Sequence, residues 1–302
     1  MTSILTNSSA ITALQSLRSV QSSLASTQKE ISTGLKVSSA TDNASTWSIA
    51  QTMKSDQGVL STISDSLSVS SSVLNVATAA VTNAISVINN IKSAVAQAAQ
   101  PGADTAKIGT SLSGLSDQLK SIVTSANFNG LNLLDGSRAD FKSIASYSDG
   151  SGTAASSLNT INLTATALIG GGGATPAVAA GGGILEAAQV GAGGVTNFTN
   201  LSSADVASST AITDTLSNAD KVIADLTKYA SQIGATQSSV NGQAAFIKTL
   251  NEGLTAGVSS LVDADMNEAS TRLQALQTQQ QLGVQSLSIA NQNSQIILRL
   301  FQ

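Results

Sequence analysis

Three carboxylates stand close together near the C-terminal end of the chain, at Asp263, Asp265 and Glu268. A cluster of this kind could act as an acid–base pair or bind Ca²⁺. The chain has no His and no Cys, which removes the commonest metal ligand, the commonest general base and any thiolate site. The spacing also lacks the further oxygen ligands of an EF-hand. We therefore interpret the three acids as a cap at a junction between helices, and we predict no enzyme activity, no cofactor and no metal.

Two glycine runs, residues 170–173 and 181–183, invite comparison with loops that bind phosphate groups. Neither is followed by the Lys-Ser/Thr pair that completes such a loop. Both lie in a Gly/Ala-rich stretch, residues 170–194, which we expect to be a low-complexity surface loop with no core of its own.

Composition narrows the fold class. Only 11% of the 302 residues are charged and 3% are aromatic, against roughly 25% charged in a typical globular protein. A core built from Leu, Ile, Val and Ala suits long helices packed side by side. The net charge of −4 and the lack of a basic patch argue against binding to nucleic acid.

No run approaches the roughly 18 consecutive apolar residues of a membrane span, and the N-terminus lacks a secretory signal pattern. These rules alone favour the cytoplasm.

Apolar residues that step alternately by three and four mark one face of a coiled-coil helix. The first such ladder predicts a helix of about 60 Å over residues 59–100, which Gln100-Pro101-Gly102 should end. Its positions are Leu60, Ile63, Leu67, Ser70, Leu74, Ala77, Val81, Ala84, Ile88, Ile91 and Val95. A second ladder predicts an antiparallel neighbour that runs into the turn at residues 127–130. Its positions are Ile108, Leu112, Leu115, Leu119, Ile122 and Ala126.

The longest ladder lies in the C-terminal part of the chain. It comprises Ile212, Leu216, Ala219, Ile223, Leu226, Ala230, Ile233, Gln237, Val240, Ala244, Ile247, Asn251, Leu254, Val258 and Leu261. After Leu261 the phase slips by one residue, which is natural where a helix leaves one bundle and enters another. The new ladder comprises Val262, Met266, Ala269, Leu273, Leu276, Gln280, Gly283, Leu287, Ala290, Ser294, Ile297 and Phe301.

The N-terminal segment has a weaker ladder of Ile11, Leu14, Leu17, Val20, Leu24, Ile31 and Leu35. Gly34 should cap this helix, and residues 37–45 should form a non-helical connector. In the middle of the chain, residues 141–147 and 158–169 alternate across a Gly-rich turn at 149–152, which predicts a β-hairpin.

The terminal segments carry very few charges. Residues 1–41 contain only Arg18, Lys29, Glu30 and Lys36, and residues 269–302 contain only Arg272 and Arg299. Ser, Thr, Asn and Gln fill the faces that ordinary exposed helices give to charged residues. Such faces can be buried against protein at low desolvation cost. Because one chain cannot surround both of its own ends, we expect other copies to do so.

Three segments carry a resemblance to a known family. They are "ISTGLKVSSATDNASTWSIA" (31–50), "NFNGLNLLDGS" (127–137) and "LVDADMNEASTRLQALQTQQQLGVQSLSIANQNSQIILRLF" (261–301). In this order they resemble bacterial flagellins, in detail the short flagellins of alphaproteobacteria. The resemblance covers roughly residues 1–140 and 205–302.

The resemblance implies a mainly α protein, a long coiled-coil-like bundle of N- and C-terminal segments with a small β-hairpin and loop insert. Residues 1–43 with 262–302 would form an inner domain of the filament, and residues 44–140 with 204–261 a helical-bundle domain. Residues 141–203 would form a short exposed insert. The family is exported through the flagellar type III apparatus without a cleaved signal, which replaces the cytoplasmic expectation by an extracellular one.

The function implied is that of a structural subunit which polymerises into the flagellar filament for swimming. Implied partners are other copies, possibly sister flagellins, an export chaperone at the C-terminal helix, and the filament cap and hook-junction proteins. The residues expected to pack the terminal helices within and between copies are Ile4, Leu5, Ile11, Leu14, Leu17, Leu24, Ile31, Leu273, Leu276, Leu287, Ile297, Leu300 and Phe301. Those expected to form the bundle seam are Leu60, Ile63, Leu67, Leu74, Val81, Ile88, Ile91, Ile212, Leu216, Ile223, Leu226, Ile233, Ile247 and Leu254.

Two alternatives remain at this point. A chemoreceptor-type signalling coiled coil is also rich in Ala, Ser and Gln heptads, but it should show membrane spans or a second module. A hook–filament junction protein belongs to the same secreted family, although its terminal motifs are usually weaker than these.

Overall fold

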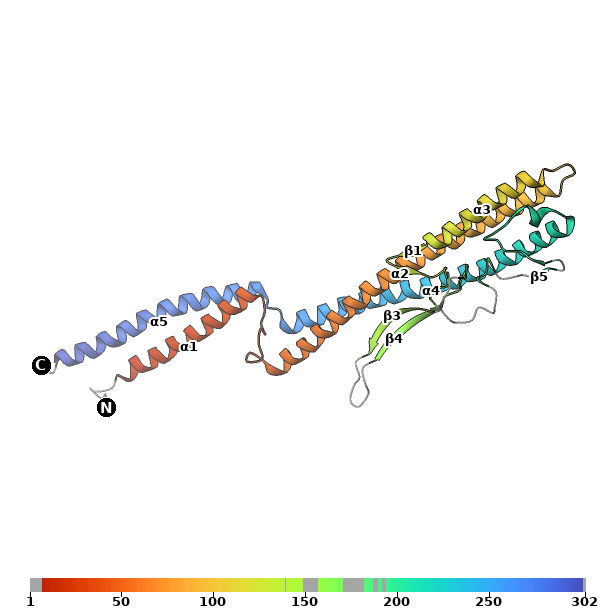
Figure 1. The fold of residues 1–302 in the computed structure, drawn as a ribbon. Coiled ribbons are helices and arrows are strands. Elements are labelled where there is room, and N and C mark those ends of the chain that lie inside the picture. The colour runs from red at the N-terminus through yellow and green to blue at the C-terminus, as the bar shows by residue number, and fades with distance from the viewer. Residues whose placement is uncertain are drawn as a thin grey trace. The chain divides into compact units, whose positions relative to one another are not determined.

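The computed structural model describes residues 7–138, 140–148, 157–170, 182–186, 190–191 and 194–300, with the backbone alone described at 190–191, 194–195 and 293–300. Most of these residues lie in long helices, and short strands occupy the middle of the chain (Figure 1), which confirms the predicted fold class. The helices are α1 (Ser8–Thr33), α2 (Ala44–Ala98), α3 (Thr105–Ser125), α4 (Ser209–Val262) and α5 (Met266–Leu300), with a 3₁₀ turn η1 (Ser203–Val206). The strands are β1 (Asn127–Phe128), β2 (Leu131–Asn132), β3 (Asp140–Ser148), β4 (Ser157–Thr164), β5 (Val190–Gly191) and β6 (Gly194–Val195).

The chain divides into two compact units. The terminal unit comprises Met1–Gly58 with Asn251–Gln302, and the central unit comprises Val59–Leu250. Both chain ends therefore belong to the same unit, and α2 and α4 each contribute residues to both units.

The first predicted ladder forms the core of the central unit. All eleven residues of this ladder, from Leu60 to Val95, are buried, and Leu67, Leu74 and Val81 have no exposed surface. Each fully buried Leu or Val contributes about 1.5–3 kcal/mol to folding. By length and composition alone α2 could cross a membrane, but these buried side chains account for its apolar character.

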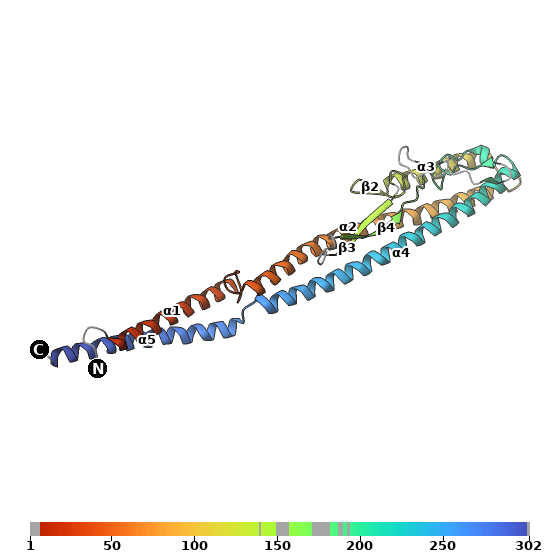
Figure 2. The same ribbon diagram turned by 90° about the horizontal axis from the view of Figure 1, so that it is seen from below.

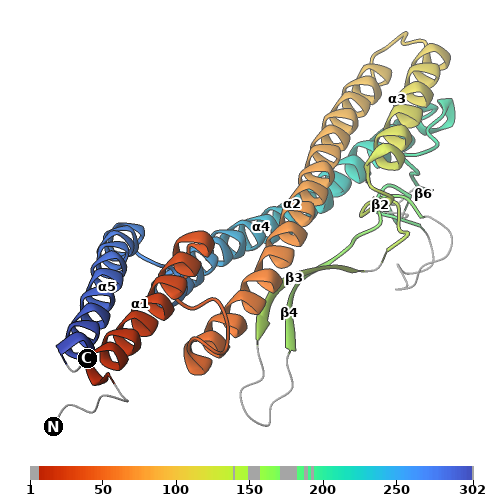
Figure 3. The same cartoon turned by 90° about the vertical axis from the view of Figure 1, so that its left-hand side faces the viewer.

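The helices end where the turn residues require. α2 stops at Ala98, before Pro101, and Gly102 takes a left-handed conformation with φ of 84°. The Asp104 side chain then caps α3 by accepting a hydrogen bond from the backbone N–H of Lys107. α3 consequently turns back along α2 (Figures 1 and 3), as the two successive ladders predicted.

Only every second residue of the ladder predicted for α3 is buried. Leu112, Leu119 and Ala126 are buried, whereas Leu115 and Ile122 are only half-buried. Ser116 and Val123 complete the buried line instead. A serine can be buried at position 116 because its hydroxyl accepts a hydrogen bond of 3.1 Å from the backbone N–H of Leu201.

α4 buries a wider face than its ladder predicted. Ile212, Leu226, Ile233 and Ile247 of the expected seam are buried, as are Ala219 and Val240, while Leu216, Ile223 and Leu254 are half-buried. A second line, one position away, is buried as well; it comprises Thr215, Val222, Tyr229 and Thr236.

The wider face arises because α4 packs on two sides. Toward α2, Gln237 donates to the Ser71 hydroxyl at 2.7 Å, and Asp220 pairs with Lys92. On its other side the Tyr229 hydroxyl donates to the carbonyl of Leu133 at 3.2 Å, and burial raises the pKa of this phenol. The predicted ladder accounts for one packed side of α4 only, whereas the structure shows one side on α2 and another on the segment of Leu133.

β3 and β4 form the predicted antiparallel hairpin. Phe141 pairs with Leu163 and Tyr147 with Leu158, and the register shifts between Ile144 and Ser146. Residues 149–152, the expected turn, lie outside the described residues. β4 ends at Thr164, so the observed strand is shorter than the one predicted from the alternation, which continued to residue 169.

Residues 170–194, expected to be a surface loop with no core of its own, contribute one residue to a core that other segments form, in the part that the structure describes. Leu185 has no exposed surface, and Leu168 and Phe198 are equally well buried. Their backbones are linked, because Leu185 N–H donates to Leu168 O at 2.8 Å and Phe198 N–H to Leu185 O at 2.9 Å. Gly183 permits this, since a Cβ there would lie 2.2 Å from the backbone carbonyl carbon of Leu168.

A second close approach joins α3 to η1. A Cβ on Gly109 would lie 2.7 Å from Cα, Cβ and N of Ser203. Because backbone atoms are involved, no side-chain rotation relieves this contact. Gly109 therefore sets how closely the segment before α4 lies on α3.

We predict that Gly109→Ala destabilises the protein by about 1–3 kcal/mol, the usual range for overpacking a filled site. The measurement is urea unfolding followed by circular dichroism. Gly114→Ala is the matched control, because this residue lies exposed on the same helix with no atom within 4 Å of the added Cβ. The control should be neutral or stabilising by up to about 1 kcal/mol. Equal behaviour of the two variants would contradict the close approach.

Candidate assembly interface

α1 and α5 lie side by side and run antiparallel (Figures 1 and 2). At one end of the pair the Asn7 side chain donates to the carbonyl of Ala290 at 2.9 Å. Further along, a Cβ on Gly283 would lie 3.2 Å from a methyl group of Leu17. Gly283 thus provides the space that Leu17 occupies, and the two contacts fix the register of the helices.

The inward positions of the pair follow an unbroken three–four repeat. In α1 they are Ala10, Ala13, Leu17, Val20, Leu24, Thr27 and Ile31. In α5 they are Ala269, Leu273, Leu276, Gln280, Gly283, Leu287 and Ala290. Of these only Thr27 and Ala269 are fully buried. The other seam side chains stay partly exposed, so the pair leaves its own seam open to further partners.

Of the predicted terminal residues whose side chains the structure describes, six of eight lie on this seam. Leu17, Leu24, Ile31, Leu273, Leu276 and Leu287 are half-buried there. The predictions for Ile4, Leu5 and Phe301 fall outside the described residues, as do those for the side chains of Ile297 and Leu300.

Ile11 and Leu14 lie off the seam. Ile11 is 60% exposed and Leu14 is 38% exposed, while Ala10 and Ala13 take the inward positions. The predicted ladder stepped by three residues from Ile11 through Leu14 and Leu17 to Val20. Nine residues are two and a half helical turns, so Ile11 faces away from Val20 by about half a turn.

Over residues 7–17 and 273–292, the outward faces of the pair combine large apolar side chains with an absence of charge. On α5, Leu282, Val284 and Ile289 are each more than half exposed, and no residue from 273 to 292 is charged. Leu282 and Ile289 flank the seam on one side of α5 and Val284 flanks it on the other, because Leu282 and Val284 are about 200° apart around the helix. Together with Ile11 and Leu14 of α1, we call these exposed residues the outer apolar face of the terminal helices. Exposed apolar patches on an uncharged surface mark a site that other protein covers.

Sequence reasoning missed Leu282, Val284 and Ile289 as candidate interface residues because they lie off the heptad ladder. The available signal was the combination of apolar residues at off-ladder positions with the lack of Lys, Arg, Asp and Glu beside them. An ordinary exposed helix face would carry charges at these positions.

The three acids near residue 265 belong to a helix junction, as interpreted from the sequence. α4 ends at Val262 and α5 begins at Met266, so the predicted phase slip coincides with a break in the helix. The Asp265 side chain accepts hydrogen bonds from the backbone N–H groups of Asn267 and Glu268, which caps α5. Glu268 pairs with Arg272 one turn later.

The chain passes this junction a second time through the connector, residues 34–43, which links α1 to α2. Gly34 caps α1 in a left-handed conformation with φ of 71°, as predicted. The backbone N–H of Lys36 donates to Val262 O at 2.7 Å, and Ala264 N–H donates to Gly34 O at 2.9 Å. Beside these bonds, Val37 packs in a small buried cluster with Ala50, Val258 and Val262.

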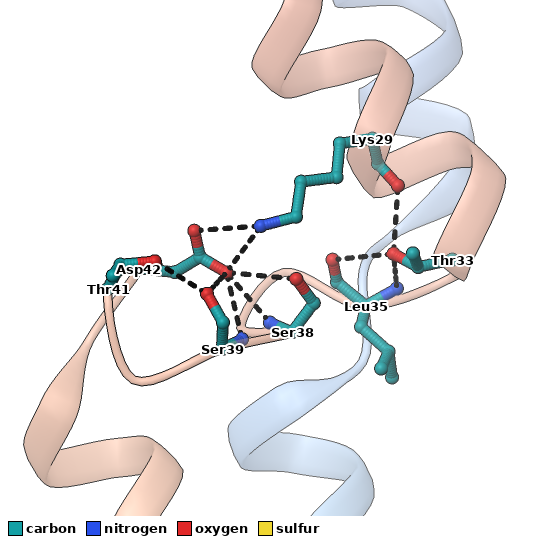
Figure 4. Close-up of polar contacts among 7 residues, drawn as sticks. All are labelled: Lys29, Thr33, Leu35, Ser38, Ser39, Thr41 and Asp42. Atoms are coloured by element: carbon teal, nitrogen blue, oxygen red, sulfur yellow. Dashed lines mark hydrogen bonds and ion pairs between the residues drawn. The ribbon is translucent and has the colours of Figure 1, made fainter.

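Asp42 organises the second half of the connector (Figure 4). One carboxylate oxygen accepts hydrogen bonds from the backbone N–H groups and the hydroxyls of both Ser38 and Ser39. Lys29, on α1, contacts both carboxylate oxygens. These bonds, the one from Lys29 foremost, hold the pKa of the Asp42 carboxyl well below its usual range.

A mainly helical chain whose two ends pair in one unit and expose an uncharged apolar face is typical of a self-assembling structural subunit. Comparison with known proteins identifies the class. Residues 4–139 match the family model of the bacterial flagellin N-terminal helical region, and residues 216–301 match that of the C-terminal helical region. The chain belongs to the bacterial flagellin family.

Relatives match over the whole length. The chain is 39% identical to Flagellin C of Rhizobium meliloti and 39% identical to a flagellin of Brucella melitensis, in each case covering 100% of both chains. It is 33% identical to Flagellin FljK of Caulobacter vibrioides, covering 100% of this chain and 99% of that one.

The chain is accordingly a structural subunit of the flagellar filament, which lies outside the cell and is built by self-polymerisation. The hook-junction alternative is not favoured, because both terminal family models and the full-length relatives are those of flagellins.

We predict that Leu282→Ser weakens assembly without affecting the central unit. Loss of one buried Leu contact costs about 1.5–3 kcal/mol, which corresponds to a rise of about tenfold or more in the monomer concentration needed for assembly. The measurement is the critical concentration for filament growth, by sedimentation. Leu158→Ser is the matched control, since Leu158 is 57% exposed on β4 and Leu282 is 59% exposed on α5. An equal effect of both changes would show that the outer apolar face has no special role.

Proposed function

We propose that this subunit polymerises through coiled-coil packing of its terminal helices between copies, and that its role is mechanical, without enzymatic activity. The observation that supports this most is the half-exposed seam between α1 and α5. Two helices that leave Leu17, Leu24 and Leu276 partly in water gain further apolar burial when neighbouring copies cover them.

The proposed division of labour follows the helix boundaries. Residues 1–43 with 262–302 form the inner part of the filament, and residues 44–140 with 204–261 the surrounding shell. The end of α1 at Thr33, the start of α2 at Ala44 and the break after Val262 support these limits, whereas the two compact units divide further along α2 and α4, after Gly58 and before Asn251. Residues 141–203 form the outer surface.

Partners other than copies of the chain are proposed on family grounds. The exposed apolar residues of α5 suit an export chaperone that covers the C-terminal helix before assembly. The filament cap and the hook-junction proteins would contact the same terminal helices at the two ends of the filament. Export through the flagellar type III apparatus would require no cleaved signal.

The test of assembly compares the full chain with a chain truncated after Glu268, both salted out and viewed by negative-stain electron microscopy. We expect long tubes from the full chain and none from the truncated chain, because the latter lacks most of α5. Circular dichroism should show that the central helices of the truncated chain remain folded. Failure of the full chain to form tubes would contradict the proposed function.

A second prediction concerns the monomer. Because a lone helix pair buries little, we expect α1 and α5 to become stable only on assembly, when intersubunit burial offsets their ordering entropy. Trypsin should therefore cut monomers rapidly at Arg18, Lys29 and Arg272, and cut filaments slowly at these sites. Lys120 and Lys228, in α3 and α4 of the central unit, serve as internal controls that should resist in both states. Resistant ends in the monomer would contradict this expectation.

A further inference from the structure

The connector between α1 and α2 is held by more hydrogen bonds than a flexible link requires. Ser38 and Ser39 donate two successive backbone N–H groups to one oxygen of Asp42, at 3.1 and 3.0 Å, and their hydroxyls donate at 3.0 Å each (Figure 4). Consecutive N–H groups that converge on one anion form a nest. Here the nest is occupied by a carboxylate of the same loop.

This nest depends on local sequence alone. Its donors lie within four residues of Asp42, so it needs no distant part of the chain. Lys29 is different, because it stands 13 residues away on α1 and reaches both carboxylate oxygens, at 3.1 and 3.0 Å. The Lys29 and Asp42 side chains are 48% and 31% exposed, and an ion pair that exposed adds little by itself.

The first half of the connector is held by other means. The backbone N–H groups of Lys36 and Val37 donate to Val262 O, and Val37 is buried in the small cluster at the junction. The Asp42 nest holds the second half, just before Asn43 caps α2 by accepting from the N–H of Thr46. Both halves are therefore fixed, although they are fixed by different interactions.

We propose that Asp42 is a positioning residue for assembly: by occupying the Ser38–Ser39 nest it fixes the path of the connector before the terminal helices pack against other copies. The proposal rests on the proposed function of filament assembly. A subunit without this nest would lose the backbone freedom of its connector only on assembly, and this entropic cost would raise the monomer concentration that filaments require.

The first test measures the critical concentration for filament growth. Asp42→Ala removes every acceptor contact of the nest, and we expect a rise of roughly tenfold, since hydrogen bonds to a charged acceptor are among the stronger ones. Lys29→Met keeps the nest and should cause a smaller rise. Thr41→Ala changes an exposed side chain of the same loop, whose hydroxyl contacts Ser39 rather than Asp42, and it should behave as wild type.

A charge exchange separates the nest from a simple ion pair. In the double variant Lys29→Asp/Asp42→Lys opposite charges still face each other, but a lysine at position 42 cannot accept from N–H groups. We expect this variant to be as impaired as Asp42→Ala. Wild-type assembly of the double variant, or of Asp42→Ala, would overturn the proposal.

Hydrogen exchange supplies a readout that does not depend on assembly. In the wild-type monomer the amides of Ser38 and Ser39 should be protected, and in Asp42→Ala they should exchange freely while amides of α3 stay unchanged. Unprotected Ser38 and Ser39 amides in the wild-type monomer would contradict a connector fixed in advance. If wild-type protein formed no filaments, the proposed function would fail while the exchange result still reported on the nest.

Discussion

Two helices packed against each other can bury only one stripe of each, and this geometric limit governs both units of the chain. In the central unit other segments pack on α2 and α4 as well, and Leu67, Leu74 and Ile88 have no exposed surface. In the described part of the terminal unit α1 and α5 pack mainly on each other, and their seam leucines remain half-buried. The same kind of repeat thus yields a closed core in one unit and an open one in the other.

The faces left open in the terminal unit can be covered at little cost. Residues 273–292 of α5 lack charges, and several threonine hydroxyls of the two helices are already bonded within their own helix. Thr12 donates to the carbonyl of Ser8, Thr271 to that of Asn267 and Thr278 to that of Gln274. A hydroxyl bonded to its own helix loses few water contacts when another helix approaches. Polar composition and readiness for burial are therefore compatible on these helices.

Regular periodicity made much of the fold predictable from the sequence. The ladder from Leu60 to Val95 identified a buried face because apolar spacing and packing agree along the whole helix. The N-terminal ladder failed at Ile11 and Leu14, where the larger apolar residues point outward and the smaller Ala10 and Ala13 point inward. Residue size suggested burial, whereas the helical period decided it. Apolar residues that stay exposed, as Ile11 and Leu14 do, weaken the amphipathic signal on which such predictions depend.

Contacts between segments distant in sequence were not predictable in this way. Leu185 lies in a Gly-rich stretch with no periodicity, and its burial depends on backbone hydrogen bonds to Leu168 and from Phe198. The contacts of Asp42 depend on the exact turn of the connector, although Ser-Ser followed by Asp before a helix is a composition that favours such side-chain-to-backbone bonds. Heptad patterns carry no information on either arrangement.

Both chain ends lie in the terminal unit. The chain leaves this unit along α2, forms the central unit and returns along α4. The terminal unit requires only that these two helices return antiparallel. The length of chain inserted between them is nearly a free variable, because the entropic cost of closing a longer loop grows only logarithmically. In the proposed arrangement, what a filament displays on its surface can therefore change in size and chemistry while the part that joins the copies stays the same.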